Sequence, residues 1–297
     1  MRILVTGKSG QLGRSIHKLV TSSKQDEDFT FVGRKELDLS NENSIAHYFD
    51  ANDRFDIVIN CAAYTAVDKA EKEFELSDKV NHLAVSQLAQ IAKEQNTKLI
   101  HISSDYVFDG ESDQSYTELD KTNPINEYGS SKLRGETHIV NNIENFFIFR
   151  VSGIFSKYGE NFVKSMIRLK DKEQLAIVSD QIMKPSSAKF IANFLKNNLL
   201  NNNFVLSNAG LYNLPSPGPQ ISWQEFAEII FKEMHKQKLI KKIPKIIPIL
   251  SKDYKSLVLR PKFSVLSNSK VKKKFILDKI NFKESLKIEL KRIYQSL

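Results

Sequence analysis

Five short apolar runs, separated by stretches with helical periodicity, constrain the fold of this chain more than any other feature. The runs cover residues 2–7, 30–33, 56–63, 98–103 and 146–151. Between them, apolar side chains recur at helical spacing, as in Leu12, Ile16, Leu19 and Val20. Strands that alternate with helices form parallel sheets covered on both faces. The pattern therefore predicts an α/β fold with a doubly wound, mostly parallel sheet.

The alternation loosens after residue 153. Ser222, followed by Glu225 three residues later, has the spacing of a capping box and predicts a helix that begins there. Further helices are expected over residues 161–170, 188–200 and 282–294. We predict a dinucleotide-binding domain of residues 1–153, to which parts of 171–200 return, and a smaller, mixed C-terminal substrate subdomain of residues 154–170 and 201–297.

A glycine-rich turn follows the first apolar run. Gly7, Gly10 and Gly13 lie between an expected strand and an expected helix. Glycine permits a tight turn and lets backbone N–H groups approach a pyrophosphate at the positive end of a helix. The spacing Gly-x-x-Gly-x-x-Gly differs from the usual Gly-x-Gly-x-x-Gly. Its place between strand and helix nevertheless indicates the dinucleotide-binding turn of a Rossmann sheet.

The second run ends in Gly33-Arg34-Lys35, where an NAD-specific fold carries an acidic residue for the adenosine 2′-hydroxyl. Arg34 would attract a 2′-phosphate that an acidic side chain would repel. We therefore predict NADPH as the coenzyme, with NADH as the alternative. Asp38 is a candidate contact for the edge of the adenine.

The composition excludes several classes of protein. The single cysteine, Cys61, leaves no intramolecular disulfide, and six scattered histidines lack the spacing of a zinc site, so we predict no metal and a cytoplasmic location. No run approaches the roughly 18 apolar residues of a membrane span. The net charge of +9 comes from lysines spread along the chain without a nucleic-acid-binding module. We predict that the protein binds neither membranes nor nucleic acids.

Two groups of polar residues are candidates for catalysis. Ser104 follows the fourth run, at the sheet edge where ligands bind, and its hydroxyl could hydrogen-bond a substrate carbonyl, although serines there also merely form turns. Tyr128 and Lys132 are four residues apart and would share one helix face. An ammonium beside a phenol lowers the pKa of the tyrosine, which suits acid–base chemistry. The same spacing is common on solvated helices, so the pair alone proves little.

The glycine turn, Ser104, Tyr128 and Lys132 occur in the order typical of the extended short-chain dehydrogenase/reductases, and the chain resembles that family. Four motifs resemble the dTDP-4-dehydrorhamnose reductase family in particular, and the likeness runs nearly end to end. They are Asn60-Cys-Ala-Ala-Tyr-Thr-Ala-Val-Asp-Lys-Ala-Glu71, Ser103-Ser-Asp-Tyr-Val-Phe108, Tyr128-Gly-Ser-Ser-Lys-Leu-Arg-Gly-Glu136 and Arg260-Pro-Lys-Phe-Ser264. The resemblance implies reduction of the 4-keto group of a nucleotide-linked 6-deoxy sugar, the last step in making an activated L-rhamnose.

The resemblance also implies roles for individual residues. Ser104 would polarise the carbonyl, Tyr128 would donate a proton to O4, and Lys132 would hold the nicotinamide ribose and depress the pKa of the tyrosine. The implied coenzyme contacts are Gly7, Ser9, Gly10, Gln11, Leu12, Gly13, Arg34, Asp38, Leu39, Cys61, Ala62, Ala63, Tyr64, Thr65, Ile102 and Lys132. The implied sugar-nucleotide contacts are Val67, Ser104, Asp105, Tyr106, Tyr128, Gly153 and Arg260.

Some positions depart from the family pattern. Members often have a tryptophan where this chain has Gly153, which offers no ring to stack on the sugar nucleotide. A 4-keto reductase or epimerase acting on a UDP- or GDP-linked sugar is therefore an alternative. Some relatives form a magnesium-bridged dimer through glutamates, but the matching positions here are Ser15 and Lys189, so we predict no such bridge and a monomer or weak homodimer.

An alternative of another class is a non-catalytic, NADP-binding regulatory subunit. A binding module has no need of a proton donor. The intact set of Ser104, Tyr128 and Lys132 therefore argues against this alternative.

Overall fold

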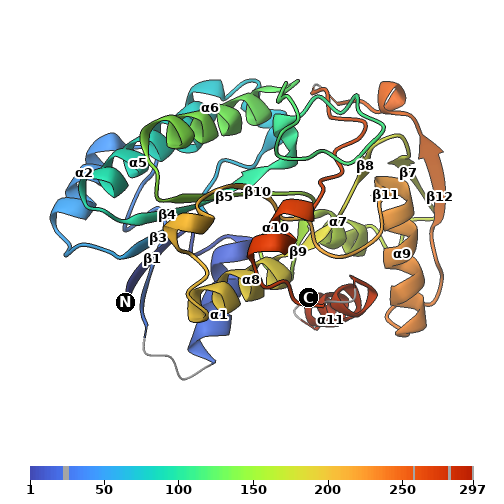
Figure 1. Cartoon of the computed structure of the whole chain (residues 1–297). Coiled ribbons are helices and arrows are strands. Elements are labelled where there is room, and N and C mark those ends of the chain that lie inside the picture. The colour runs from blue at the N-terminus through green and yellow to red at the C-terminus, as the bar shows by residue number, and fades with distance from the viewer. Residues whose placement is uncertain (23–26, 257, 280–281, 296–297) are drawn as a thin grey trace.

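The computed structural model describes residues 1–22, 27–256, 258–279 and 282–295. A six-stranded sheet lies between two layers of helices (Figure 1). The strand order is β10-β5-β4-β3-β1-β2, and every neighbouring pair is parallel. The strands are β1 (Arg2–Thr6), β2 (Asp28–Val32), β3 (Ile57–Asn60), β4 (Lys98–Ser104), β5 (Phe146–Val151) and β10 (Gly210–Asn213). The predicted doubly wound α/β fold is confirmed.

Helices cover both faces of this sheet because successive strand residues point to opposite sides. Ile3 and Val5 pack with one hydrophobic cluster, and Leu4 between them packs with the other. One face carries α1 (Gln11–Thr21) and α8 (Ala188–Leu200), and the opposite face carries α2 (Glu42–Asp50), α5 (Ala84–Glu94) and α6 (Glu127–Asn142) (Figure 1). The chain switches direction across the sheet between β1 and β3, and such a switch point creates a crevice beyond the carboxyl ends of the strands.

The helical stretch between β3 and β4 is interrupted. It is divided into α3 (Val67–Ala70), α4 (Phe74–Asp78), the π-helical turn η1 (Lys79–Leu83) and α5. Asn81 lies in the π-helical turn, and its side chain accepts a hydrogen bond from the backbone N–H of Tyr64 and donates one to the carbonyl of the same residue. The interruption therefore anchors the loop that follows β3, as π-helical turns often do near functional sites.

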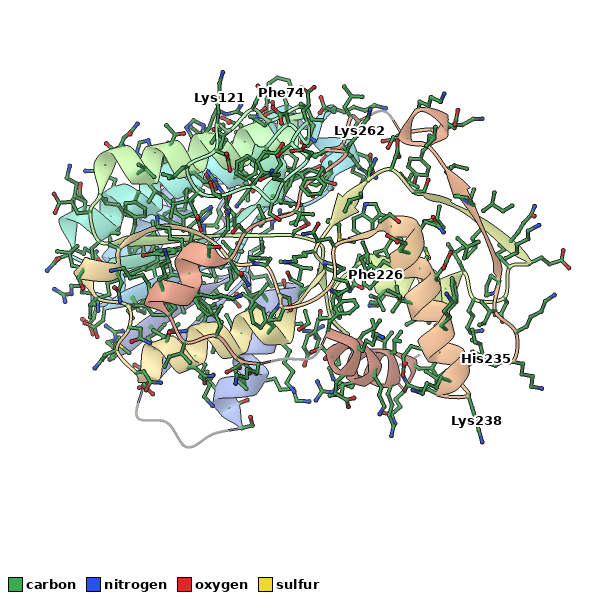
Figure 2. All side chains as sticks on the ribbon, turned by 45° about the vertical axis from the view of Figure 1, so that its right-hand side comes forward. Phe74, Lys121, Phe226, His235, Lys238 and Lys262 are labelled. Carbon is green, nitrogen blue, oxygen red and sulfur yellow. The ribbon has the colours of Figure 1, made fainter. Side chains whose placement is uncertain are left out.

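A second hydrophobic cluster lies beside the sheet. The helices α7 (Phe162–Arg168), α9 (Trp223–Lys236) and α11 (Phe282–Tyr294) pack around it. Figure 2 shows Phe226 inside this part of the molecule and His235 and Lys238 at its outer end. The capping box at Ser222 and Glu225 is confirmed, because each side chain bonds the backbone N–H of the other residue.

Short strand pairs connect this cluster to the rest of the chain. The pairs are β6 (Ile154–Phe155) with β9 (Ser186–Ser187), β7 (Gln174–Val178) with β12 (Lys245–Ile249), and β8 (Ile182–Met183) with β11 (Ile221–Ser222). The remaining elements are α10 (Ser269–Lys274) and the 3₁₀ turns η2 (Asp105–Val107), η3 (Leu206–Asn208) and η4 (Ser251–Asp253).

One part of the predicted substrate subdomain lies elsewhere. Strand β10 pairs with β5 as the sixth strand of the central sheet, and Phe275 packs in the core on the face covered by α1 and α8. The alternation of strands and helices did not reveal β10, because this strand has only four residues and irregular segments lie beside it. The rest of the domain division stays a prediction.

The described residues form neither a membrane-spanning helix nor a metal-binding cluster of side chains. None of the helices that they form combines the length and the apolar character needed to cross a membrane. Nor do these residues contain a group of three or more histidine, cysteine or acidic side chains arranged to hold a metal ion.

Candidate active site

A cavity of about 560 Å³ opens beyond the carboxyl ends of the central strands. It is lined from the sheet side and also by residues between Gly153 and Ser264 from the other part of the molecule. Clefts of roughly 300–1,000 Å³ are typical of small-molecule sites. Every predicted site residue lines the cavity except Gly13, Tyr64 and Arg260.

The glycine turn has the geometry expected of a phosphate-binding loop. Gly7 adopts φ +72°, and a Cβ added there would lie 2.8 Å from the backbone nitrogen of Ala62. Gly10 is the N-cap residue of α1 and donates its backbone N–H to the carbonyl of Gly7. A Cβ on Gly13 would lie only 2.2 Å from that carbonyl oxygen. Gly13 therefore lets the helix approach the turn but does not itself line the cavity, and its predicted role as a contact stays a prediction.

Tyr64 and Arg260, the other two predicted residues that do not line the cavity, are hydrogen-bonded to acidic side chains. The hydroxyl of Tyr64 donates to Glu73 at 2.8 Å. The guanidinium of Arg260 donates to both carboxylate oxygens of Asp68 at 2.6 and 2.8 Å. Each is bound to an acidic side chain that the sequence did not connect with it, and their predicted roles as coenzyme and sugar-nucleotide contacts stay predictions.

Charged residues line the far end of the cavity beside β2. Arg34 is 73% exposed, and its Nε lies 3.9 Å from a carboxylate oxygen of Asp38. Asp38 accepts hydrogen bonds from the backbone and the hydroxyl of Ser40. Glu36 is neutralised by Lys8 at 2.6 Å and accepts from the backbone N–H of Gly33. The solvated guanidinium of Arg34 is therefore available to an anion. The carboxylate of Glu36 nearby is already paired with Lys8.

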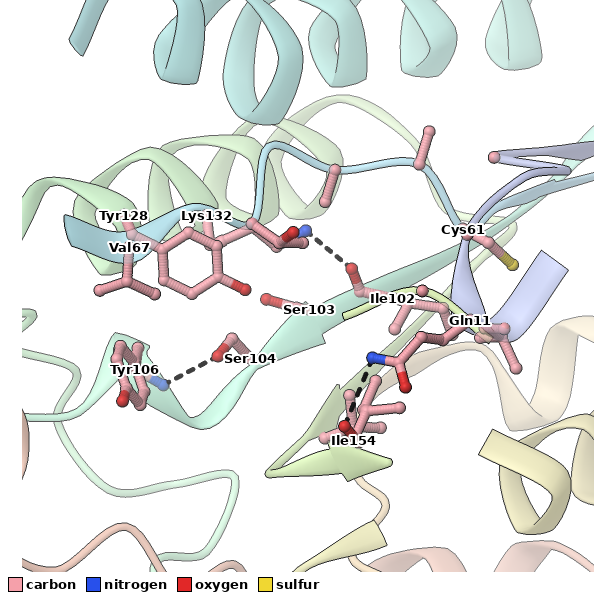
Figure 3. A pocket seen from close by; sticks show the side chains of 18 of the residues that line it. Gln11, Cys61, Val67, Ile102, Ser103, Ser104, Tyr106, Tyr128, Lys132 and Ile154 are labelled. Atoms are coloured by element: carbon pink, nitrogen blue, oxygen red, sulfur yellow. Dashed lines mark hydrogen bonds between the residues drawn. The ribbon is translucent and has the colours of Figure 1, made fainter. Parts of the chain in front are cut away.

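Gln11 links the glycine turn to the opposite wall. Its side-chain N–H donates to the carbonyl of Ile154 at 3.4 Å (Figure 3). Its side-chain oxygen accepts from Ser156 and Asn161 at 3.0 Å each. The first turn of α1 is thereby tied to β6 and to the start of α7. This contact fixes the width of the cavity at the turn.

The candidate catalytic residues lie on one wall of the cavity (Figure 3). Asn126 caps α6 by accepting from the backbone N–H of Gly129. A Cβ on Gly129 would lie 2.1 Å from the carbonyl oxygen of Tyr106, so glycine allows α6 to pack against the end of β4. This close packing places Tyr128 and Lys132 beside Ser104.

The electrostatics of this wall differ from the prediction. Burial raises the pKa of Tyr128 to about 12, although hydrogen bonding with Ser104 acts in the opposite direction. The sequence predicted a pKa lowered by Lys132, but the Nζ of Lys132 instead donates to the carbonyl of Ile102 at 2.7 Å and lies 3.1 Å from His101. A phenol that keeps its proton at neutral pH is suited to donate it, so the correction still favours Tyr128 as an acid.

Asp105 is a buried carboxyl group held by serine hydroxyls. It accepts from Ser104 at 3.0 Å and from Ser152 at 2.6 Å, and Ser264 also bonds it. Burial raises the pKa of this carboxyl group, and the three hydroxyls oppose that shift. Asp105 therefore joins the ends of β4 and β5 to the segment that contains Ser264, rather than presenting a free carboxylate to the cavity.

Several lining residues were not predicted. Among them are Ser103, Gln181, Met183, Trp223 and Pro261. Ser103 Oγ is buried and has no hydrogen-bond partner within the described residues. The capping box predicted the first turn of α9 and hence the location of Trp223 in a helix, but no local pattern showed which way the indole points. Gln181 and Met183 come from segments without periodicity, so sequence carried no signal for them. Ser103 and Pro261 lie inside two of the quoted motifs but were not singled out as site residues.

Gly153 lines the cavity with φ +52°. A Cβ added there would lie 3.1 Å from the sulfur of Met183 and 3.3 Å from the Cα of Pro185. Met183 therefore occupies space that a side chain at position 153 would need. Trp223, the only tryptophan of the chain, lines the same cavity from α9 and packs on Phe162 at 4.6 Å between ring centroids.

The lining fits a phosphorylated dinucleotide. Gly7 and Gly10 present bare backbone at the N-terminus of α1, and the small side chains of Ala62 and Ala63 leave room for a flat ring. Arg34 adds a cation at the adenosine end. Ser9, Leu12, Leu39, Cys61, Thr65 and Ile102 complete the predicted set that lines this side. Their roles as coenzyme contacts stay predictions.

Comparison with protein families and curated sequences gives consistent matches. The family model described as "RmlD substrate binding domain" matches residues 1–295. A dTDP-4-dehydrorhamnose reductase from Aggregatibacter actinomycetemcomitans is 36% identical over 290 residues, which is 96% of this chain and 97% of that protein.

Solved structures agree. The crystal structure of a dTDP-4-dehydrorhamnose reductase from Clostridium acetobutylicum superposes with a TM-score of 0.87 at 32% identity, over 99% of both chains. The enzyme of the same name from Bacillus anthracis, solved in complex with NADP, gives a TM-score of 0.86 at 31% identity, over 98% of this chain and 99% of that chain.

Proposed function

Because this chain belongs to the dTDP-4-dehydrorhamnose reductase family, we propose that it uses NADPH to reduce the 4-keto group of dTDP-4-dehydro-L-rhamnose and so forms dTDP-L-rhamnose. One observation carries the proposal for this particular chain. Ser104, Tyr128 and Lys132 line the cavity that also contains the glycine turn. The residues that would donate to a carbonyl oxygen and the turn that would bind a dinucleotide thus line the same cavity.

Each catalytic side chain has a distinct task in this proposal. NADPH, when bound, supplies the hydride that attacks C4. The Ser104 hydroxyl turns from Asp105 to donate a hydrogen bond to the keto oxygen. Tyr128 gives its phenolic proton to the same oxygen as the alcohol forms, and the positive charge that Lys132 carries when protonated stabilises the phenolate left behind.

The substrate assignment has further support from apolar and aromatic residues on both sides of the cavity. Val67, Tyr106 and Trp223 give the sugar end of the cavity apolar and aromatic surface, which suits one face of a sugar or a base. Tyr106 and Tyr128 contact each other edge to face, with ring centroids 5.7 Å apart. We propose that Met183 and Trp223 together take the place of a ring at position 153.

A coupled assay tests the proposal. Purified protein with dTDP-4-dehydro-L-rhamnose and NADPH should lose nicotinamide absorbance and form dTDP-L-rhamnose, identified by mass spectrometry and by its sugar configuration. UDP- and GDP-linked 4-keto sugars form the comparison panel, and NADH replaces NADPH in a second series. Faster turnover of another nucleotide sugar would reassign the substrate. NADPH binding without turnover of any sugar would favour the regulatory alternative.

Location and assembly belong to the proposal as well. The coenzyme and a single unpaired cysteine support a cytoplasmic site of action. A monomer or weak homodimer without a metal bridge stays a prediction, supported by Ser15 and Lys189, neither of which is an acidic metal ligand.

A further inference from the structure

A chain of buried hydrogen bonds runs behind the catalytic wall. Thr6 Oγ1 donates to Asn60 Oδ1 at 2.7 Å, Asn60 Nδ2 lies 3.1 Å from His101 Nδ1, and His101 Nε2 lies 3.1 Å from Lys132 Nζ. These four residues are at most 1% exposed. They come from β1, β3, β4 and α6, so this series of hydrogen bonds links the glycine turn to Lys132 across the sheet.

The orientation of the Asn60 amide is determined by a backbone donor. Its Oδ1 accepts from the backbone N–H of Ala62 at 3.2 Å as well as from Thr6. A backbone N–H can only donate, so the oxygen must face Ala62 and the NH₂ group must face His101. His101 Nδ1 therefore accepts a hydrogen bond, and in a neutral imidazole the proton then resides on Nε2.

This tautomer places an N–H group against Lys132. An ammonium has three donors and no lone pair, whereas a neutral amine can accept. The contact between His101 Nε2 and Lys132 Nζ is therefore satisfied only when Lys132 is neutral, and the amine still donates to Ile102. Burial acts in the same direction, because it lowers the pKa of Lys132 to about 8 and that of His101 well below its usual value.

The other charged groups nearby do not remove this preference for a neutral Lys132. Glu136, on the same helix, acts to raise the pKa of Lys132, but it is itself paired with Arg150 from β5 at 2.6 Å. Tyr128, one turn earlier on α6, carries no charge at neutral pH because burial raises its pKa. His101 is the titratable group in direct hydrogen-bonding contact with Lys132.

We propose that His101 is a positioning residue for the reduction: its Nε2–H group donates to the Lys132 amine and sets the pH at which Lys132 gains a proton. The proposal rests on the function assigned to Lys132 above. Reduction needs the ammonium form beside the Tyr128 phenolate. The rate should therefore fall as pH rises through the titration of Lys132, and the imidazole N–H brings that fall into the working pH range.

Nuclear magnetic resonance of the wild-type protein tests the tautomer without a mutation in the site. Long-range proton–nitrogen spectra of histidine-labelled protein should show one of the six histidines as the neutral, Nε2-protonated form across neutral pH. The signal absent from His101→Gln assigns it, and His47→Gln, an exposed histidine on α2, serves as the matched control. A His101 that is protonated at Nδ1 or at both nitrogens would overturn the proposal.

The pH profile tests the consequence. In His101→Gln a carbonyl oxygen can accept from the ammonium, so the alkaline limb of kcat for reduction should move upward by about one pH unit, while His47→Gln should match the wild type. A limb that stays in place in folded His101→Gln would contradict the proposal. If His101→Gln does not fold, assignment of the wild-type spectrum by elimination through the other five histidine variants still decides.

The result can be separated from failure of the proposed function. If the wild type does not reduce the sugar nucleotide, the tautomer and the titration of Lys132 followed by lysine carbon resonances still test the contact with His101. A Lys132 that titrates at the same pH in His101→Gln as in the wild type would then reject it.

Discussion

The two walls of the cavity are built differently. The sheet wall includes Lys132, and Asn60 and His101 lie buried directly behind it, each with a specified hydrogen-bond partner. On the opposite wall, Met183 and Trp223 come from a two-residue strand and the first turn of a helix, and they contribute mainly apolar surface. The first wall can hold protons at defined atoms, whereas Met183 and Trp223 on the second wall can shape what enters.

This difference suggests a division of labour. Burial on the sheet wall shifts the pKa values of Tyr128 and Lys132, and such shifts are what acid–base chemistry requires. Apolar contact on the other wall discriminates between ligands by shape and area. Changes on the sheet wall should therefore affect kcat and pH dependence, and changes on the other wall should affect KM.

The largest effect is expected for Tyr128→Phe. Loss of the phenolic proton should lower kcat about 10³-fold, because general acid catalysis typically contributes 10²–10⁴-fold. The dissociation constant of NADPH, measured by calorimetry, should stay within about twofold, because the hydroxyl group is not part of the glycine turn. Tyr48→Phe on α2 is the matched control. A variant that keeps wild-type kcat would show that Tyr128 is not the proton donor.

Lys132→Met should change how stability depends on pH. The pKa of Lys132 is about 8 in the folded protein, against 10.5 for an ordinary lysine. Between these values the unfolded chain binds more protons, so this group makes the folded state more stable as pH rises, by on the order of 3 kcal/mol in total. Denaturant unfolding of the wild type and the variant should show that the stability of the wild type relative to the variant increases between pH 8 and 10.

The difference between the two proteins isolates Lys132. Burial raises the pKa values of Cys61 and Tyr128 to about 12 each, and both groups act in the opposite direction at alkaline pH. Those contributions are common to the two proteins and cancel in the subtraction. Equal pH dependence in both would show that Lys132 titrates normally in the folded state.

The sheet wall was also the part that sequence predicted best. Apolar runs located its strands, and Ser104, Tyr128 and Lys132 followed from position and spacing. The partner of Lys132 could not be predicted, because His101 lies 31 residues away and is brought close only by the pairing of strands and the packing of α6. The predicted lowering of the pKa of Tyr128 was wrong for a related reason. The burial that raises this pKa depends on the whole fold rather than on a neighbour four residues away.

The opposite wall was largely hidden from sequence. Its lining residues lie in short strands and loops whose direction depends on long-range contacts, such as that between Ile182 and Phe263. Arg260 illustrates the limit, because its motif indicated a site residue but not its ion pair with Asp68, which is 192 residues away in the chain. Composition and periodicity carry no information on such pairs.

Trp223→Ala tests the second wall. Removal of the indole should raise KM for the sugar nucleotide about tenfold, which corresponds to roughly 1.4 kcal/mol, and should leave kcat within about twofold. Trp223→Phe keeps a ring and is the matched control for lost packing against Phe162. Because Trp223 is the only tryptophan, its fluorescence in the wild type should also change when the sugar nucleotide binds. A fall in kcat at unchanged KM would contradict the division between the walls.

The smallest effect is expected for Asp68→Asn, which alters the ion pair between the loop after β3 and the segment beyond residue 258. The carboxylate of Asp68 is 57% exposed, so the pair itself adds little stability, about 1 kcal/mol or less. If Arg260 turns toward the substrate phosphates, the neutral amide should release it more readily and lower KM by about twofold to threefold. Arg260→Lys should then raise KM, since a lysine cannot form the two parallel hydrogen bonds of a guanidinium. If Arg260 only fastens the two segments together, both variants should keep wild-type KM and lose stability instead, and steady-state kinetics beside denaturant unfolding distinguishes these outcomes.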